Sequence, residues 1–466
     1  MELMYRAVLF CLCLKVSICS ETYKAAVVTG NFANGLGSFL PQIGGATKQE
    51  ADIVLLSTDV PASEFCSDAV CRPENYDELV REISSAAKKY NVYIVTHLCE
   101  RVRCDGGDEV VRSNLVFDRR GGVVTAYKKP LNNQAVCNTT TSETVTFATD
   151  FGVDFVLLMG DDVILQDLAA LRNVKNLIVT GGSKSDMAYL RANQLIQSLA
   201  YVTSANVISD SGVFAGEAGL RNEGGLVQEI GKESGVKSEE IFFGLLDSQA
   251  GEDLSRYTIR PLDLKVSREG DRQTVCHGKL CCEFYVKTKT IDTENTPYGF
   301  AVFDGIRQVG KNFVGVEVCS LVACATHDRK TCEYGMEEHV NVTFDKISIT
   351  GNFTGRHSAQ FPVVLTSQTS LPSDTFAFVA APVNDVKQVN VQLSDARDIF
   401  KFGILGHDFS KQSLDTFSNE TDTKTRDNSD FYEYIFNEEV VEFFDSVWIK
   451  LRVLLFIVSV YILEMM

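Results

Sequence analysis

Apolar runs and helical stretches alternate along the first half of the chain. The runs YKAAVV (23–28) and ADIVLLS (51–57) predict strands. YDELVREISSAAKKY (76–90) has helical spacing and leads into the apolar run NVYIVTHL (91–98). Strands that alternate with helices indicate an α/β domain in which helices cover the sheets.

A hairpin and one further strand of this half bear on function. VVRSNLVFD (110–118) and VVTAYKK (123–129) flank the pair Gly121-Gly122, which predicts a β-hairpin. The apolar run DFVLLM (154–159) then ends at Gly160 and meets two aspartates. A strand that ends in a small turn is a common place for a nucleophile, but glycine has no side chain to supply one.

The pattern changes near residue 250, where strand-like runs, turn residues and six cysteines replace the alternation of strands and helices. We therefore place an α/β domain at residues 21–249 and a second, mostly β domain at residues 250–425. The Ser/Thr/Asp-rich composition of the chain after that predicts a linker or stalk at residues 426–446.

Both ends of the chain have the pattern of segments that are removed from a mature protein. In residues 1–20, Arg6 precedes an apolar run that ends on small residues, which predicts a secretory signal; a first buried strand is the alternative. In the hydrophobic tail, residues 447–466, the wholly apolar part is shorter than the about 20 residues that cross a bilayer. The tail predicts a glycolipid-anchor signal and a cell-surface protein, with a short membrane anchor or a buried final helix as alternatives.

Composition narrows the function. The chain is 45% hydrophobic and 23% charged, which is typical of a globular protein. The net charge of −18 argues against a nucleic-acid partner, because phosphate binding needs clustered Lys and Arg. The six histidines are scattered and no Cys/His cluster has zinc spacing, so we expect neither a metal nor another cofactor.

Secretion would also explain the cysteines and the glycosylation motifs. Three of the fourteen cysteines lie in the signal and eleven remain, an odd number, so we expect five disulfides and one free thiol. Sequons of the form N-x-[ST], which predict N-glycosylation, lie at Asn138, Asn341, Asn352 and Asn419.

Several stretches carry a resemblance to a known family. CHGKLCCEFYV, YGFAVFDGIRQVG, VEVCSLVACATHDRKTC and GNFTGRHSAQFPVVLTS resemble the C-terminal domain of the vanin and biotinidase family, in its insect vanin-like type. These are secreted members of the nitrilase, or carbon–nitrogen hydrolase, superfamily. YKAAVV, SNLVFD and AYKKPL agree with the family's first domain, so the resemblance covers nearly the whole chain after the signal. It implies a nitrilase-like four-layer αββα sandwich followed by a disulfide-bonded, mostly β second domain.

The resemblance also implies a chemistry carried by three residues. A glutamate in an F-P-E-D-G type motif is the general base, and a lysine in a Y-[RH]-K motif stabilises the tetrahedral intermediate. A cysteine in an F-T-C-F-D type motif attacks the amide carbon and forms a thioester. Such a reaction needs a thiolate, a base within hydrogen-bond reach, and positive charge or N–H donors for the oxyanion.

Carried over by position, the motifs keep one of the three residues. AYKKPL keeps the lysine as Lys129. In DIVLLSTDV, Ser57 occupies the glutamate position, and in FVLLMGDDVIL, Gly160 occupies the nucleophile position while Asp162 matches the motif's aspartate. A further family glutamate shortly after the lysine has Gln134 as its nearest equivalent.

This pattern predicts an enzyme fold without its chemistry. Gly160 has no atom that could attack a carbonyl, and Ser57 is a poor proton acceptor compared with a carboxylate. We expect a secreted, membrane-anchored pseudoenzyme that binds a small pantetheine-like or biotinyl amide through Lys129 without cleaving it. The alternative is an active amidohydrolase with relocated catalytic groups.

Two interpretations of Lys129 stay open: a surface lysine at the end of the hairpin, or a lysine in the pocket. In a pocket without its glutamate, its charge would need Asp59, Asp161 or Asp162, or would be neutralised. We expect the pair Asp161-Asp162 to be a solvated loop or a strand-end cap and not a catalytic dyad, because adjacent residues of an extended chain point apart.

The cysteines suggest pairs by proximity. Cys66 with Cys71, and Cys99 with Cys104, are close enough in sequence to pair locally. Cys137 is then the odd thiol, either free or in an intermolecular disulfide; as a relocated nucleophile it would need a base that the sequence does not identify. The other cysteines suggest three bridges in the second half, among Cys276, Cys281, Cys282, Cys319, Cys324 and Cys332.

Overall fold

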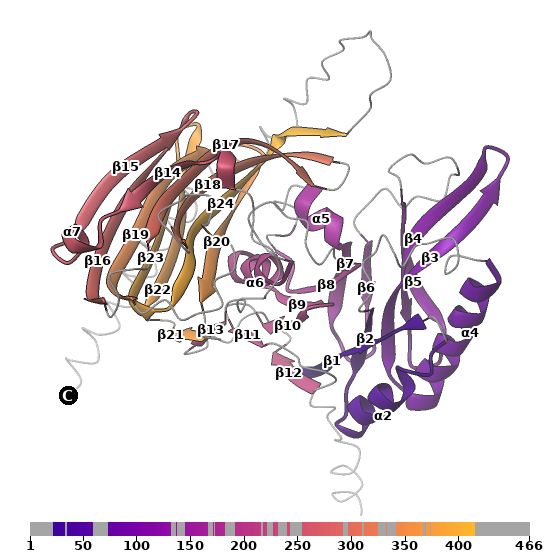
Figure 1. Ribbon diagram of the computed structural model, residues 1–466. Helices are drawn as coiled ribbons and strands as arrows, with labels where there is room; N and C mark the ends of the chain where they lie inside the picture. The colour runs from indigo at the N-terminus through magenta and orange to yellow at the C-terminus, as the bar shows by residue number, and fades with distance from the viewer. Residues whose placement is uncertain are drawn as a thin grey trace, which may run out of the picture. The chain divides into compact units, whose positions relative to one another are not determined.

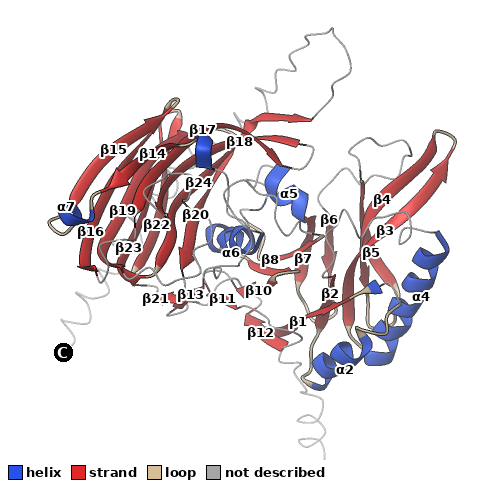
Figure 2. Cartoon of the chain, viewed as in Figure 1, coloured by secondary structure: helices blue, strands red, loops and turns tan. Residues whose placement is uncertain are grey.

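The computed structural model describes most of the chain between residues 22 and 414 (Figures 1 and 2). The described residues are 22–32, 35–58, 73–131, 137, 145–165, 171, 173–181, 192–215, 218–220, 227–231, 240–242, 254–291, 297–309, 312–324, 332, 342–366, 370–372 and 374–414. The expected signal, stalk and hydrophobic tail lie outside them.

The first half of the chain forms two six-stranded sheets. Sheet A has the order β12-β1-β2-β3-β4-β5, in which β1, β2 and β3 are parallel. Its strands are β1 (Thr22–Gly30), β2 (Ile53–Thr58), β3 (Tyr93–Cys104), β4 (Gly107–Phe117), β5 (Val123–Pro130) and β12 (Val227–Gly231). β4 and β5 form the expected hairpin, and Gly121 in its turn has φ +83°, a conformation that favours glycine.

Sheet B has the order β11-β10-β9-β8-β7-β6, in which β7, β8 and β9 are parallel. Its strands are β6 (Val145–Ala148), β7 (Asp154–Met159), β8 (Asn176–Thr180), β9 (Asn206–Ser209), β10 (Gly212–Ala215) and β11 (Ala218–Leu220). Alternate residues of the two sheets meet in one buried core, to which β2 contributes Ile53 and Leu55 and β8 contributes Ile178. The two sheets therefore lie face to face.

Helices cover the outer face of each sheet, as Figure 2 shows. On sheet A lie α2 (Leu40–Lys48) and α4 (Pro73–Tyr90); α4 buries Leu79, Ile83 and Ala87, which helical spacing places on one side. On sheet B lie α5 (Gly160–Leu165) and α6 (Ala192–Thr203). The layers run helix, sheet, sheet, helix, which is the four-layer αββα sandwich that the sequence predicts.

The second half is a β-sandwich of two antiparallel five-stranded sheets. Sheet C has the order β14-β17-β18-β24-β20 and sheet D the order β15-β16-β19-β23-β22. Sheet C consists of β14 (Thr258–Leu262), β17 (Tyr298–Val309), β18 (Asn312–Ala323), β20 (Ser358–Thr366) and β24 (Ile399–Leu414). Sheet D consists of β15 (Asp271–His277), β16 (Leu280–Ile291), β19 (Val342–Thr354), β22 (Phe376–Val383) and β23 (Val386–Arg397). Phe284, Phe300 and Phe344 are fully buried between them.

Two short helical elements lie at the start of this sandwich, the 3₁₀-helix Leu254–Arg256 and α7 (Leu264–Ser267). Three disulfides confirm the three bridges expected in this half. They join Cys276 to Cys281, Cys282 to Cys319, and Cys324 to Cys332.

The α/β layers and the β-sandwich share a core, because the outer face of sheet C packs on α6. Gln194 and Ser198 of α6 donate hydrogen bonds to the carbonyls of Val364 and Pro362 in β20, the edge strand of sheet C. The helix thus covers an edge that would otherwise expose unpaired backbone groups.

A short strand also links the two halves. β13 (Glu240–Phe242), within the run EEIFFGLLD of the first half, pairs with β21 (Ser370–Pro372) of the second. Residues 1–415 form one compact unit; a second unit, from Thr416 onward, lies outside the described residues. In the part of the chain that the structure describes, no helix is both long and apolar enough to cross a membrane.

Candidate functional site

A row of polar side chains crosses the inner face of sheet A. Because side chains alternate along a strand, the buried inner-face residues Tyr93 and Val95 of β3 place His97 on the same face. Asn114 lies opposite His97 on β4, and Tyr127 lies opposite Asn114 on β5.

Ser57 extends this row on β2, because Ile53 and Leu55 of the same strand face the inner core. Its neighbour Thr58 ends the strand. In the motif F-P-E-D-G the glutamate directly precedes the aspartate, and here Thr58 directly precedes Asp59. By this spacing Thr58 is an alternative to Ser57 for the position to which the resemblance assigns the glutamate, and each has a hydroxyl side chain.

Lys129 also faces inward, and its ammonium forms an ion pair with Asp162. The Lys129 side chain is 22% exposed and that of Asp162 is 1% exposed. Of the two interpretations of this lysine, the structure favours the pocket, and it selects Asp162 from the three candidate counter-charges.

Asp162 joins three elements through its carboxylate. One oxygen accepts hydrogen bonds from the Tyr127 hydroxyl at 2.9 Å and from the backbone N–H of Met159 at 2.8 Å, and the other binds Lys129. Asp162 thus ties the end of β7 and the start of α5 to β5. It is a cap, as expected, but it is buried and not solvated; the Asp161 side chain lies outside the description.

Gly160 is buried at the junction of β7 and α5. In the parallel pair β7 and β8, Met159 lies beside Thr180. The residues that follow them, Gly160 and Gly181, are therefore also neighbours, at the point where the chain leaves the two strands. Parallel strands are about 4.8 Å apart.

His97 reaches across from sheet A to this point. A Cβ added to Gly181 would lie 2.6 Å from Cε1 and 2.7 Å from Nε2 of the His97 ring, and Gly181 has φ +59°. Only glycine therefore fits against the imidazole here. The buried Thr180 hydroxyl, on the same face of β8 as the core residue Ile178, makes no hydrogen bond within the described structure.

Sequence reasoning missed His97 and Asn114. His97 Nδ1 lies 2.6 Å from Asn114 Oδ1, and Asn114 Nδ2 donates to the carbonyl of Leu158 at 3.2 Å. A signal was present, because a histidine stands at an inner-face position of the otherwise apolar run NVYIVTHL.

Lys128, next to Lys129, faces the other side of sheet A. It forms an ion pair with Glu100 at 2.5 Å, with side-chain exposures of 27% and 22% respectively. The two adjacent lysines are therefore similarly exposed, and only Lys129 faces the space between the sheets.

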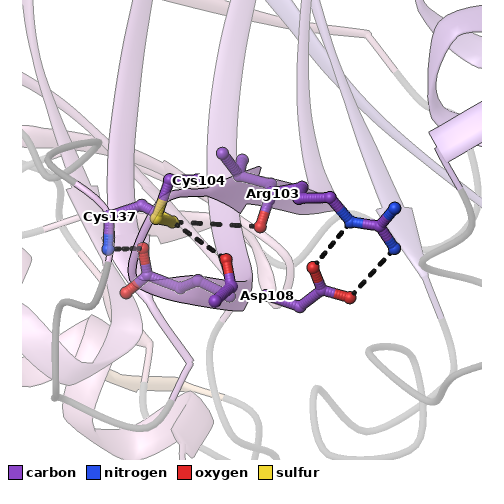
Figure 3. The surroundings of a disulfide bond; sticks show 7 residues. Arg103, Cys104, Asp108 and Cys137 are labelled. Atoms are coloured by element: carbon purple, nitrogen blue, oxygen red, sulfur yellow. Dashed lines mark hydrogen bonds and ion pairs between the residues drawn. A yellow bond between two sulfur atoms is a disulfide. The ribbon is translucent and has the colours of Figure 1, made fainter.

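Cys137 is disulfide-bonded to Cys104, so the expectation of an odd thiol there is wrong (Figure 3). The proposed pair Cys99 with Cys104 is wrong for the same reason; Cys99 is disulfide-bonded as well, and its partner lies outside the described residues. The Cys137 N–H also donates to Glu109 at 3.2 Å. These contacts hold the chain after Lys129 against the end of the β3–β4 hairpin, where Arg103 and Asp108 form an exposed ion pair.

Other expected residues are only partly described. Asp59, Cys66, Cys71, Gln134, Asn138, Asn341 and Asn419 lie outside the described residues. Asn352 is exposed in β19. Within the described ranges, no group of three or more His, Cys, Asp or Glu side chains is arranged to hold a metal ion.

Comparisons with known proteins place these observations among relatives. The Vanin C-terminal domain family model matches residues 248–412. Vanin-like protein 3 of Drosophila melanogaster is 26% identical over 422 residues, covering 77% of this chain and 80% of that protein. Vanin-like protein 1 of the same organism is 24% identical over 487 residues, covering 84% and 87%. Biotinidase of Takifugu rubripes is 23% identical over 349 residues, covering 63% and 68%.

Two solved structures with some similarity are an amidase and a carbon–nitrogen hydrolase. An amidase from Nesterenkonia sp. is 16% identical, with a TM-score of 0.33, and covers 46% of this chain and 88% of that one. A carbon–nitrogen hydrolase from Helicobacter pylori G27 is 17% identical, with a TM-score of 0.34, and covers 45% and 89%.

Proposed function

Because this chain belongs to the vanin and biotinidase family, we propose that it is a degenerate carbon–nitrogen hydrolase that binds a small amide without cleaving it. The observation that carries the proposal is Gly160, which stands at the end of β7 where the family motif has its cysteine. Losing one member of a catalytic set that works as a unit removes most of its rate advantage. Here the base is missing as well, since neither Ser57 nor Thr58 has a carboxylate.

The state of Lys129 supports the same proposal. In the family chemistry, the lysine stabilises an oxyanion with its positive charge. Here Asp162 already neutralises that charge, and a ligand would have to compete with a buried carboxylate for it. A neutral ligand that accepts one hydrogen bond from the ammonium fits this site better than an anionic intermediate does.

A linear amide of the pantetheine or biotinyl type is the ligand class that the family suggests, and one relative is named Biotinidase. The inner face of sheet A offers a hydroxyl group from Ser57 and an imidazole group from His97. Such groups pair with the N–H and C=O of an amide and require no cofactor.

We further propose that the protein is extracellular and attached to the cell surface. Four disulfides among the described residues suit an oxidising compartment. The exposed Asn352 is accessible for N-glycosylation, and residues 1–20 and 447–466 have the patterns of a secretory signal and a glycolipid-anchor signal.

An active amidohydrolase with relocated groups would need a new nucleophile. Cys137 was the candidate, but in its disulfide with Cys104 it has no thiolate to offer. The alternative therefore lacks a residue to carry it.

The test is amide hydrolysis by the protein secreted from cells that express the full chain, at high protein concentration, with pantetheine and a biotinyl amide. We expect no turnover, and a ligand-induced rise in melting temperature. Lys129→Ala should reduce that rise, and Lys128→Ala, a similarly exposed lysine on the opposite face, should not. Turnover that Lys129→Ala abolishes would establish an active hydrolase, and the absence of any thermal shift would exclude these amides as ligands.

A further inference from the structure

A histidine on the neighbouring strand β3 lies beside the position on β2 where the family motif has its carboxylate. β2 and β3 are parallel, with Leu55 beside Val95, so the same register brings His97 into line with Ser57. An imidazole therefore lies next to the position from which the family's base would act.

The hydrogen bonds around Asn114 determine which ring nitrogen of His97 carries the proton. Asn114 Nδ2 donates to the Leu158 carbonyl, so Oδ1 is the atom that faces the imidazole, and an amide oxygen only accepts. The hydrogen therefore sits on Nδ1. In the neutral ring the lone pair is then on Nε2, which is the arrangement of a histidine base oriented by a second residue.

The lone pair lies at the end of β7 and β8. The ring rests against Gly181, which is the strand neighbour of Gly160. The buried Thr180 hydroxyl lies on the same inner face, one residue before Gly181. Both strand ends lack side chains where the imidazole approaches, so a group over Gly160 is within reach of the ring.

We propose that His97, oriented by Asn114, is the proton-accepting residue of this site and binds an N–H or O–H of the ligand that lies over Gly160, with Thr180 as the second hydrogen-bonding group. Asn114 is a positioning residue, and His97 contacts the ligand. The inference deepens the proposed amide-binding site by assigning its acceptor. It also predicts that ligands need a donor hydrogen, so a primary or secondary amide binds and a tertiary amide does not.

Among the residues that the structure describes, few charged groups lie near the ring. On the inner face of sheet A they are Arg112 and Lys129, and Asp162 of α5 neutralises the latter. The inner-face residues of β7 and β8, which include Met159 and Thr180, are uncharged. Among these described groups, only the imidazole of His97 belongs to a residue type with an ordinary pKa near neutral pH.

The test places a reporter thiol at the site through Gly160→Cys in the full-length protein. Iodoacetamide, itself a small primary amide, alkylates that thiol: the S–H proton passes to Nε2 and then to solvent, and the thiolate displaces iodide and forms the S–C bond. The rate is followed between pH 5 and 9 by mass spectrometry of the peptide that contains position 160, so that no other thiol contributes.

We expect alkylation at pH 6.5 to be at least about ten-fold faster than for an ordinary thiol, because an imidazole lowers the pKa of a neighbouring thiol. His97→Gln in the same background should abolish that advantage, and Asn114→Leu should reduce it. His357→Asn, a change at an exposed residue of the β-sandwich, is the control and should leave the profile unchanged. A profile that His97→Gln leaves unchanged would overturn the proposal.

A second measurement covers the case in which the thiol variant does not fold. Histidine ring resonances of the unmodified protein, assigned by difference from His97→Gln, should show the Nδ1–H form, and Asn114→Leu should remove it. The Nε2–H form at His97 would refute the inference. Neither measurement uses turnover or pantetheine. A result that refutes the role of His97 is therefore distinguishable from a failure of the proposed function.

Discussion

His407 is the group whose substitution should change the pH dependence of folding most clearly. It lies on β24, is 0% exposed, and neither ring nitrogen has a hydrogen-bond partner in the described structure. Its neighbours two residues away, Leu405 and Phe409, lie in the apolar layer between sheet C and the helices of the α/β part. Burial lowers the pKa of His407 to about 4, while the negative charge of the nearby Asp408 acts in the opposite direction.

The size of the effect follows from the two pKa values. In the unfolded chain the imidazole has its ordinary pKa of about 6.5, so between pH 6.5 and 4 the unfolded state binds a proton that the folded state does not. Stability is therefore lost as the pH falls through this window. A difference of 2.5 units gives about 3 kcal/mol in full, of which about 2 kcal/mol appears between pH 7 and pH 5.

Urea unfolding of the non-reduced protein at pH 5, 6 and 7 measures this. His407→Leu should flatten the pH dependence by about 2 kcal/mol relative to the wild type and raise stability at pH 7 by about 1 kcal/mol, because an unpaired buried polar group is removed. His357→Asn, at an exposed position with φ +48°, should leave the dependence as it is. If His407→Leu and the wild type lose the same stability between pH 7 and pH 5, the buried neutral imidazole is refuted.

Three further predictions concern single side chains. Lys129→Met should destabilise the fold by about 3 kcal/mol in urea unfolding, because it leaves the buried Asp162 without its counter-charge, whereas Lys128→Met should lower stability by less than about 1 kcal/mol. Burial raises the pKa of Glu317, so its contribution to stability is lost as the pH rises above the unfolded value; Glu317→Gln should raise stability more at pH 7 than at pH 4. Cys137→Ala should speed limited proteolysis after β5, with little change in the far-ultraviolet circular dichroism spectrum, because the disulfide restrains one segment only.

The layers of the fold could be predicted because their signal is local. The apolar residues of α4 recur with helical spacing, and the strands β1, β2 and β7 are short apolar runs bounded by polar turns. The pairing of β13 escaped prediction because its partner β21 lies more than a hundred residues later. Nothing in the run IFFGLL (241–246) indicates which distant strand it will pair with.

The disulfides also show that the sequence does not identify which residues become neighbours in space. Cys276 and Cys281 are five residues apart and pair, because a hairpin turn between β15 and β16 brings them opposite each other. Cys99 and Cys104 are also five residues apart, but both lie on the extended strand β3, about 16 Å apart at the usual rise per residue. Disulfide geometry requires less than about 7 Å between Cα atoms. The pairing of Cys99 with Cys104, which was predicted from sequence proximity alone, was therefore wrong.

The site was predictable residue by residue but not as an arrangement. The motifs located Lys129 and Gly160, yet the imidazole between the sheets came from β3, which carries no family motif. The position of this imidazole depends on how three strands of sheet A pack against two strands of sheet B. Only the inner-face alternation of NVYIVTHL hinted at it.

The presence of Lys129 is therefore weak support for catalysis. Its partner Asp162 also receives the Met159 N–H and the Tyr127 hydroxyl, so the ion pair stabilises the junction of β7 and α5 whether or not a substrate is ever cleaved. A lysine that pairs with a buried carboxylate therefore has a structural role that does not depend on catalysis. The end of β7 is held by Asp162 and not by a side chain at position 160. The structure of this junction therefore depends on the side chain of Lys129 and not on one at position 160.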